Sequence, residues 1–345
     1  MFISDENYFY SMILKESKSN VDELLIEKED CYEKFYIPKK DGIRTICSID
    51  KESTLYQLQK KLVNNFFINI PLPIPVKGFK KGESYNTFLI HHINRNYYLR
   101  LDIKNYFGSI KEQHIKEGLG EYVSNNASII DKIIDICTLD GSLPQGAITS
   151  PILSNIIFRQ VDQRIVKYCQ CYGVEYTRYA DDLFFSSDQL DFSLKPYFIR
   201  KIKRILREHK FECNGSKKKI DKDFISLSGY VVGDDIHLSR KKLHEINEIL
   251  FFFRKNKQIN GSKYEVDTSI LRNPQWINDI NSLALKNRYN EVLRFENKGQ
   301  FINYLCGYRS FLISIIKANG EKQKEMRKLQ HKISNIEKLI NAICV

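Results

Sequence analysis

The sequence has few of the features that mark secreted, zinc-binding or membrane-spanning proteins. Its eight cysteines form no CxxC pair and have no histidine partner at zinc-ligand spacing, which argues against a zinc site and favours free thiols. No apolar run approaches the length of about 18 residues that a membrane helix needs, and no secretory apolar segment follows Met1. We therefore expect a cytoplasmic protein in a reducing compartment, with no membrane partner.

Acidic residues are fewer than basic ones. The chain has 54 Lys and Arg against 42 Asp and Glu, a formal net charge of +12. Such an excess favours a polyanionic partner, because neutralised phosphates release their condensed counterions; a merely soluble basic protein is the alternative. The positive charge is concentrated in residues 195–256, where aromatic side chains lie among the basic ones. This composition suits a groove that follows a nucleic-acid backbone, and a solvated helix face is the alternative for any single run.

The chain has no repeat and no low-complexity linker, so its organisation is inferred from element patterns. An Asp-Gly dipeptide inside residues 35–49 predicts a β-hairpin. Alternating apolar and polar residues predict a strand over 97–103, and residues 175–187 are typical of strand, tight acidic turn and strand. A helix is expected to begin with Ser150 as its cap, because a proline follows and apolar residues recur at helical spacing. After Ser239 the pattern is almost wholly helical.

Three aspartates are the candidates for chemistry. Asp181 and Asp182 occupy the predicted acidic turn, where a solvated loop is the ordinary explanation. Asp102 lies on the polar face near the end of another strand, so all three carboxylates converge at one sheet edge if the two strands are neighbours. Clustered carboxylates suit Mg²⁺, and two such ions clamp the attacking and leaving oxygens of an in-line phosphoryl displacement.

The segment Tyr179-Ala180-Asp181-Asp182 resembles the YxDD signature of reverse transcriptases. Further blocks resemble that family in the same order over roughly residues 35–235. These blocks are IPKKDGIRTI (37–46), LRLDIKNYFGSI (99–110), LPQGAITSPILSNIIF (143–158), FECNGSKKKI (211–220) and SLSGYVV (226–232). The resemblance implies RNA-directed DNA polymerase activity, with the metal ligands Asp102, Ile103, Asp181 and Asp182 and two Mg²⁺ ions, or Mn²⁺ in their place.

The same resemblance implies an α/β right-hand polymerase fold of fingers, palm and thumb. The palm is expected to be an antiparallel sheet with helices, and the C-terminal thumb to be all helical. N-terminal helices and fingers are assigned to residues 1–95, the palm with interleaved fingers segments to 96–238, and the thumb and C-terminal helix to 239–345. Apolar residues in 326–340 follow helical spacing too briefly for a coiled coil, so we expect packing on the thumb, with a dimer seam as the alternative.

Several residues acquire nucleotide-binding roles from the resemblance. Lys39, Lys40 and Arg44 suit the charges of a triphosphate. Phe107 falls where the family places the aromatic ring that excludes a ribose 2′-hydroxyl, and a core aromatic is the alternative. Gln145 is expected to contact nucleotide and template, unless it is an ordinary loop glutamine. The remaining implied contacts are Lys217 with nucleotide, and Tyr179, Asn214, Lys218, Lys219, Gly229, Arg240, Lys241 and Lys242 with nucleic acid.

The chain most resembles retron and related defence-associated bacterial reverse transcriptases. His92 matches the histidine of the retron Asn-Ala-x-x-His segment, but Phe88 and Leu89 stand in place of Asn-Ala. Ser228 likewise departs from the retron Val-Thr-Gly segment. Retron and non-retron defence types therefore both stay open, and His92 has a satisfied polar residue as its alternative reading. A group II intron-type enzyme and a catalytically inactive RNA-binding fold are further alternatives, and the intact aspartate triad argues against the inactive one.

The implied partners follow from this family. They are a structured, dedicated noncoding RNA template, dNTPs, the DNA product with its RNA–DNA duplex, and a separately encoded effector protein in antiphage defence. RNA is expected to contact residues 195–256 and the thumb. Charge reversal at Lys217, Lys218 and Lys219 is expected to remove RNA without affecting the carboxylates.

Overall fold

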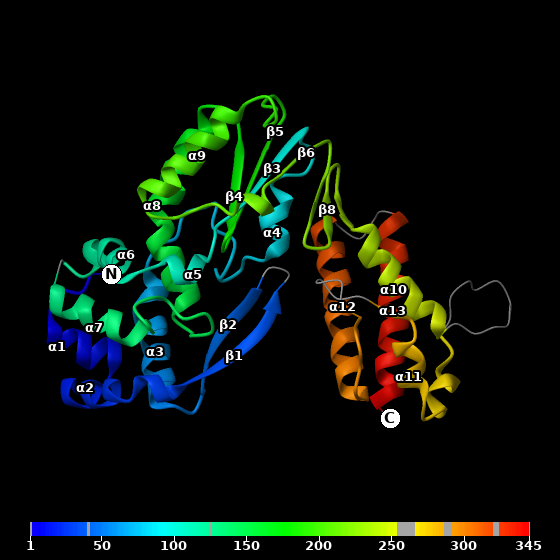
Figure 1. Ribbon diagram of the computed structural model, residues 1–345, viewed down its shortest axis with the longest axis horizontal. Coiled ribbons are helices and arrows are strands. Elements are labelled where there is room, and N and C mark those ends of the chain that lie inside the picture. The colour runs from blue at the N-terminus through cyan, green and yellow to red at the C-terminus, as the bar shows by residue number, and fades with distance from the viewer. Residues whose placement is uncertain are drawn as a thin grey trace. The chain divides into compact units, whose positions relative to one another are not determined.

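The chain folds into two compact units, Met1–Asp223 and Phe224–Val345 (Figure 1). The boundary falls ahead of residue 239, so residues 224–238 belong to the same unit as the C-terminal helices; the predicted three-part division stays a prediction. The computed structural model describes residues 2–39, 42–124, 126–253, 266–285, 292–319 and 324–344.

A four-stranded antiparallel sheet forms the centre of the first unit. Its strands are β3 (Tyr97–Asp102), β4 (Glu175–Tyr179), β5 (Asp182–Ser187) and β6 (Lys219–Lys222), in the order β4-β5-β3-β6. This confirms the predicted strand at 97–103 and the strand–turn–strand at 175–187. Because side chains alternate across a strand, Phe185 contacts Phe198 on one face while Phe184 contacts Phe88 on the other.

The first unit also contains helices, most of which bury an apolar face in the core. They are α1 (Glu6–Tyr8), α2 (Lys18–Ile26), α3 (Thr54–Asn65), α4 (Tyr85–Ile90), α5 (Tyr106–Ser109), α6 (Glu112–Leu119), α7 (Ala127–Cys137), α8 (Ser150–Gln170) and α9 (Pro196–Glu208). Short 3-10 or π segments are η1 (Phe9–Leu14), η2 (Lys28–Cys31), η3 (Phe67–Asn69), η4 (Gly120–Tyr122) and η5 (Gly215–Lys217). The faces of α8 and α9 that meet the sheet are buried, among them Leu153, Val161 and Ile202.

The start of α8 differs in detail from the sequence prediction. Ser150 is the first helical residue, and its hydroxyl donates to the Pro144 carbonyl at 2.7 Å. It therefore ties the preceding loop to the helix and does not cap it. Pro151 lies in the first turn, as expected, where its missing N–H costs no hydrogen bond.

A separate two-stranded sheet confirms the predicted hairpin. Its antiparallel strands are β1 (Tyr32–Lys39) and β2 (Gly42–Ile49). Lys40 and the side chain of Lys39 lie outside the described residues.

The second unit begins with strands and continues with helices. Strands β7 (Ile225–Leu227), β8 (Tyr230–Val232) and β9 (Ile236–Leu238) form a three-stranded antiparallel sheet. After it come α10 (Arg240–Phe252), the 3-10 helix η6 (Thr268–Arg272), α11 (Trp276–Asn281), α12 (Lys298–Asn319) and α13 (Lys324–Cys344).

Helix α13 packs against α12 and α10, as expected for residues 326–340. Met326, Ile336 and Leu339 are buried, and Arg309 on α12 pairs with Glu337 at 2.6 Å. The antiparallel sheet with helices and the helical C-terminus confirm the expected fold class. Within the described ranges, no helix has the length and apolar character to cross a membrane.

Candidate active site

Three aspartates meet at one end of the central sheet. The strands β3 and β5 are antiparallel neighbours, with Asp102 and Asp182 as directly opposed residues. The Ile103 amide donates to the Asp181 carbonyl at 2.9 Å, which holds the turn against the end of β3. The condition set by the sequence, that the two strands be neighbours, is therefore confirmed.

Two basic side chains face these carboxylates. Arg100 lies two residues before Asp102 on the same face of β3 and donates to Asp182 Oδ1 from Nε at 2.9 Å and from Nη2 at 2.5 Å. Lys217 Nζ lies 2.9 Å from Asp102 Oδ2. The predicted nucleotide residue Lys217 is thus brought to the carboxylates, and its reversal to Glu would oppose Asp102. This corrects the expectation that reversing Lys217–Lys219 leaves the carboxylates unaffected.

Burial and mutual repulsion set the electrostatics of the turn. Burial raises the pKa of Asp181 to about 6, and the charges of Asp182 and Asp102 add to the rise. Burial also raises the pKa of Asp182, while the Arg100 guanidinium opposes the rise. Negative charge is therefore costly at this edge of the sheet, and a bound cation would lower that cost.

The residues present fit a divalent cation. Asp102 is 1% exposed, and its Oδ1 atom is buried without a hydrogen-bond partner in the described structure. Asp181 and Asp182 add oxygen donors of the kind that Mg²⁺ prefers. As the side chains stand, no three His, Cys, Asp or Glu residues of the described ranges form a ready metal cluster, since Asp102 and Asp182 face Lys217 and Arg100.

The predicted nucleotide contacts lie on three further elements. Phe107, on α5, is half-buried, with its ring centroid 6.2 Å from that of Phe79. Arg44 lies on β2 and is half-buried. Gln145 precedes α8, and its carbonyl accepts from the Cys47 amide of β2 at 2.8 Å. The Gln145 loop is therefore attached to the hairpin that carries Arg44.

The neighbouring glycine explains how that loop can approach so closely. Gly146 has a φ of +135°, and a Cβ at this position would lie 2.4 Å from the Cys47 carbonyl oxygen. Only a glycine combines this backbone conformation with this contact.

The predicted nucleic-acid contacts are divided between the two units. Tyr179 packs edge-on to Tyr85, with ring centroids 5.1 Å apart. The backbone N–H of Asn214 donates to the Asp102 carbonyl at 2.7 Å. The Asn214 side-chain oxygen accepts from the backbone N–H of Ser216, and this bond shapes the turn that carries Lys217. Lys218 is exposed, and Lys219 pairs with Asp221 at 3.2 Å.

The other contacts predicted for nucleic acid lie in the second unit. Gly229 has a φ of +92°, and a Cβ there would lie 3.2 Å from Lys242 Cγ. Lys242 pairs with Glu245 at 2.7 Å, whereas Arg240 and Lys241 are exposed.

His92 takes its alternative reading, a satisfied polar residue. It is fully buried, with Nδ1 2.7 Å from Ser186 Oγ and Nε2 2.8 Å from Thr177 Oγ1. Thr177 Oγ1 donates to the Phe88 carbonyl, so His92 Nε2 donates to Thr177 and Nδ1 accepts from Ser186. Phe88 and Leu89, which depart from the retron pattern, are buried core residues of α4.

Arg100, Phe79 and the buried pair Arg178 and Asp162 had no role predicted from the sequence. A signal for Arg100 was available, because it shares the polar face of its strand with Asp102. Arg178 stands out as a charged residue between Thr177 and Tyr179 in the interior of its strand, whereas Phe79 and Asp162 have no comparable local signal.

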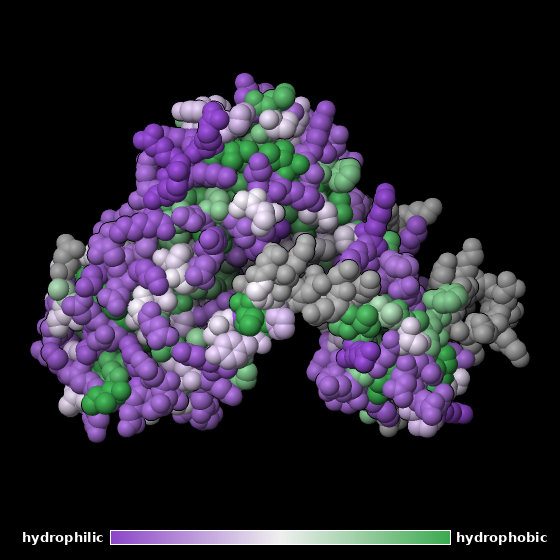
Figure 2. Space-filling model, viewed as in Figure 1, coloured by the Kyte–Doolittle hydropathy of each residue, from purple (hydrophilic) through white to green (hydrophobic). Residues whose placement is uncertain are grey.

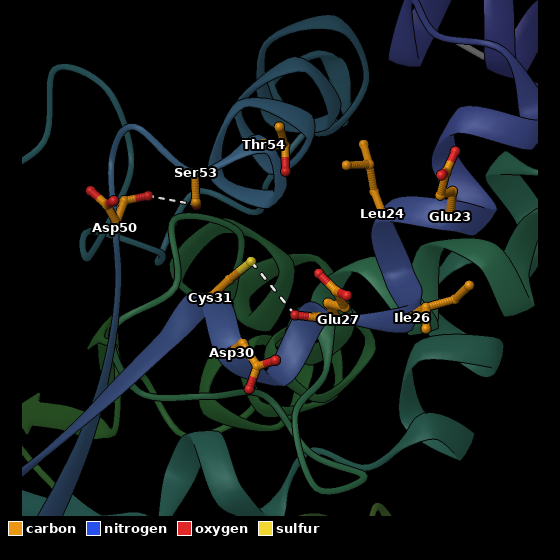
Figure 3. Close-up of a pocket in the computed structure, with 9 residues that line it drawn as sticks. All are labelled: Glu23, Leu24, Ile26, Glu27, Asp30, Cys31, Asp50, Ser53 and Thr54. Carbon is orange, nitrogen blue, oxygen red and sulfur yellow. Dashed lines mark hydrogen bonds between the residues drawn. The ribbon is translucent and has the colours of Figure 1, made fainter.

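A pocket elsewhere in the first unit carries none of the predicted residues (Figure 3). Figure 3 shows it between α2, η2 and the start of α3, with the carboxylates of Glu23, Glu27, Asp30 and Asp50 around it. Nothing that binds an anionic nucleotide lines it, so the sheet edge with Asp102 is the better candidate.

Comparison with known proteins agrees with this geometry. Residues 37–232 match the family described as reverse transcriptase (RNA-dependent DNA polymerase). Similar curated proteins include the retron Mx65 reverse transcriptase of Myxococcus xanthus, 26% identical over 68% of this chain and 59% of that protein. The retron Ec86 reverse transcriptase of Escherichia coli is 32% identical over 48% of this chain and 52% of that protein. The chain thus spans between half and two thirds of the length of these two relatives.

Solved structures with a similar arrangement include apo telomerase from Candida tropicalis. It has a TM-score of 0.42 and 11% identity, over 90% of this chain and 67% of that one.

Proposed function

This chain belongs to the reverse transcriptase (RNA-dependent DNA polymerase) family, and on this premise we propose that it copies an RNA template into DNA. The observation that carries the proposal is the opposed pair Asp102 and Asp182, with Asp181 beside them at the turn. Three carboxylates at the end of two neighbouring strands are the donor set that phosphoryl transfer between nucleotides needs.

Asp102, Asp181, Asp182 and the backbone of Ile103 would hold two Mg²⁺ ions, with Mn²⁺ as the alternative. Such ions stabilise the charge that develops on the phosphoryl oxygens. Arg100 holds Asp182 in one orientation through its two hydrogen bonds. Lys217 supplies a cation beside Asp102, where it can turn toward an arriving triphosphate.

The incoming nucleotide is assigned to the hairpin and the loops beside it. Lys39, Lys40 and Arg44 bind the triphosphate, Gln145 contacts the base or sugar edge, and Phe107 excludes the ribose 2′-hydroxyl. The bond between Gln145 and Cys47 supports this assignment, because it joins the loop to the strand that carries Arg44.

The partners proposed for the chain are a structured noncoding RNA, dNTPs and the RNA–DNA duplex that it makes, with a role in antiphage defence beside a separate effector. Similarity to the retron reverse transcriptases supports a retron-like system. Crosslinking the protein in cells and sequencing the attached nucleic acid tests this. A branched RNA–DNA product is expected of a retron, and a random sample of cellular RNA would contradict a dedicated template.

The direct test is synthesis on a defined RNA template with a DNA primer, Mg²⁺ and labelled dNTPs. Asp181→Asn and Asp182→Asn are each expected to lower kcat/KM by about a hundredfold or more while the protein stays folded. Asp188→Asn, which removes an exposed carboxylate just beyond the opposite end of β5, is the matched control and is expected to retain activity. Incorporation close to wild type in the Asp181 or Asp182 variant would refute the assignment.

A further inference from the structure

A buried ion pair lies beneath the aspartate turn. Arg178, on β4, and Asp162, on α8, are both 0% exposed. The guanidinium donates from Nε to Asp162 Oδ1 at 2.9 Å and from Nη2 to Oδ2 at 2.8 Å, a two-point contact. The Tyr176 hydroxyl donates to Asp162 Oδ1 at 2.8 Å. Because burying two charges costs about as much as their attraction returns, stability alone does not account for such a pair.

The third nitrogen of Arg178 connects two parts of the candidate site. Nη1 donates to the Ala180 carbonyl at 3.1 Å and to the Tyr106 hydroxyl at 3.1 Å. Ala180 precedes Asp181 and has a φ of +54°, a left-handed conformation that a non-glycine residue adopts only when its surroundings hold it. Tyr106 directly precedes Phe107 on α5. One guanidinium nitrogen therefore touches the backbone of the aspartate turn and the helix that carries Phe107.

Helix α8 supplies the fixed base for these contacts. Ser154, Phe158 and Asp162 recur every four residues and so share one face of the helix. The Tyr106 hydroxyl donates to the Ser154 carbonyl at 3.2 Å, and the Arg178 guanidinium lies 4.6 Å from the Phe158 ring centroid. Helix α8 thus holds both parts of the site: it contacts α5 through Tyr106 and the aspartate turn through Arg178.

We propose that Arg178, held in place by Asp162, is a positioning residue that fixes the aspartate turn relative to Phe107 and thereby sets the exclusion of ribonucleotides. The inference rests on the proposed polymerase function. A displacement of about 1 Å is enough to change rates strongly when a reacting group must be aligned. Loosening the Arg178 link is therefore expected to change sugar selection as well as rate.

Two tyrosines of the network provide a matched test. Tyr106→Phe removes the hydroxyl that links Arg178 to α5, whereas Tyr176→Phe removes a hydroxyl that contacts only the Asp162 side of the pair. Both rings are buried, and each variant keeps its ring. Tyr106→Phe loses the hydrogen bonds with Ser154 and Arg178, and Tyr176→Phe loses the one with Asp162. We expect Tyr106→Phe to lower the kcat/KM ratio of dGTP over rGTP about tenfold and Tyr176→Phe to leave the ratio unchanged. Equal ratios in the two variants would overturn the proposal.

Hydrogen exchange tests the same link without requiring polymerase activity. Arg178→Lys keeps the charge but loses the planar fork, so we expect faster amide exchange both in residues 103–110 and in residues 180–183. If this variant does not fold, Tyr106→Phe is measured in its place, with faster exchange expected in 180–183 and Tyr176→Phe as the control. Unchanged exchange in these segments would overturn the positioning role. If the wild-type protein made no DNA, that result would count against the proposed function alone.

Discussion

Phe107 is held less tightly than a core aromatic. It is half-buried, and its ring contacts Phe79 and Tyr106, of which Phe79 is itself 44% exposed. A ring at the margin of the core can stand against a bound sugar on its open side. This position suits the proposed sugar-selecting role.

Phe107→Ala is expected to admit ribonucleotides, because it opens the space that a 2′-hydroxyl would occupy. The use of dNTPs should fall only modestly, while the kcat/KM ratio of dGTP over rGTP should fall about a hundredfold or more, given the steric nature of the exclusion. Steady-state kinetics with both nucleotides measures the ratio. An unchanged ratio would identify Phe107 as packing only.

His92 is a buried neutral histidine whose effect appears in stability. Burial holds the pKa of His92 well below its ordinary value. As the pH falls below about 6.5, this histidine therefore binds a proton in the unfolded chain but stays neutral in the folded one. Its contribution to stability is therefore complete above that pH and is lost as the pH falls below it.

We expect the free energy of unfolding to fall by about 1.4 kcal/mol per pH unit below pH 6 on account of this one group. His92→Gln should flatten that part of the profile, at the cost of lower stability at pH 7. Urea unfolding of both proteins between pH 5 and pH 7 gives the two slopes. Parallel profiles would show that His92 is protonated in the folded protein.

At the scale of elements, the loop before α8 is fitted to the hairpin through Gly146. The Gly146 conformation and the close approach to Cys47 must both be kept if the Gln145 carbonyl is to accept from β2. The position of the hairpin, and with it Arg44, therefore depends on a contact made by a residue about a hundred positions away in the sequence.

Gly146→Ala is expected to move this loop and to raise the KM for dNTPs by about tenfold, because the added Cβ would overlap the Cys47 carbonyl. Gly141→Ala is the matched control, since Gly141 also has a positive φ, of +67°, but an added Cβ there would meet nothing within 4 Å. The control should lose only about 1 kcal/mol of stability and keep its KM. Equal KM changes would mean that backbone strain, and not the contact with β2, matters.

Across the whole molecule, the excess positive charge has one well-defined site in α9. Tyr197, Arg200, Arg204 and Arg207 recur every three or four residues and form one solvent-facing stripe, opposite buried residues such as Ile202. Tyr197 is 60% exposed, and the Arg200 guanidinium lies 5.9 Å from its ring centroid. Hydrophilic side chains gather over this part of the surface (Figure 2). An exposed ring beside cations suits a stacked base and its phosphates.

Replacing Arg200, Arg204 and Arg207 together by Gln is expected to weaken RNA binding and to reduce the slope of log K against log salt by about two. Lys15, Lys51 and Lys60 are exposed elsewhere in the first unit, and their replacement by Gln removes the same net charge. Filter binding of a structured RNA at several salt concentrations compares the two variants. The same loss in both would mean that net charge alone, and not the α9 stripe, attracts the RNA.

The sequence alone was enough to predict the hairpin of β1 and β2, the strand of Asp102, the acidic turn and the family. These features depend on turn residues and on alternation over a few positions, and both are local properties of the chain. The block motifs indicate the family for the same reason, because each motif has a characteristic spacing of residues within a short segment.

Only the tertiary structure decided which side chains meet. Lys217 pairs with Asp102, which lies 115 positions earlier in the sequence. Arg178, on β4, contacts Asp162 on α8 and Tyr106 on α5. His92 became a buried hydrogen-bonded residue, and Ser150 bonded to the preceding loop instead of capping its helix. Contacts of this kind depend on how elements that are far apart in the sequence pack together. The periodicity within one segment does not indicate which other segment it will pack against.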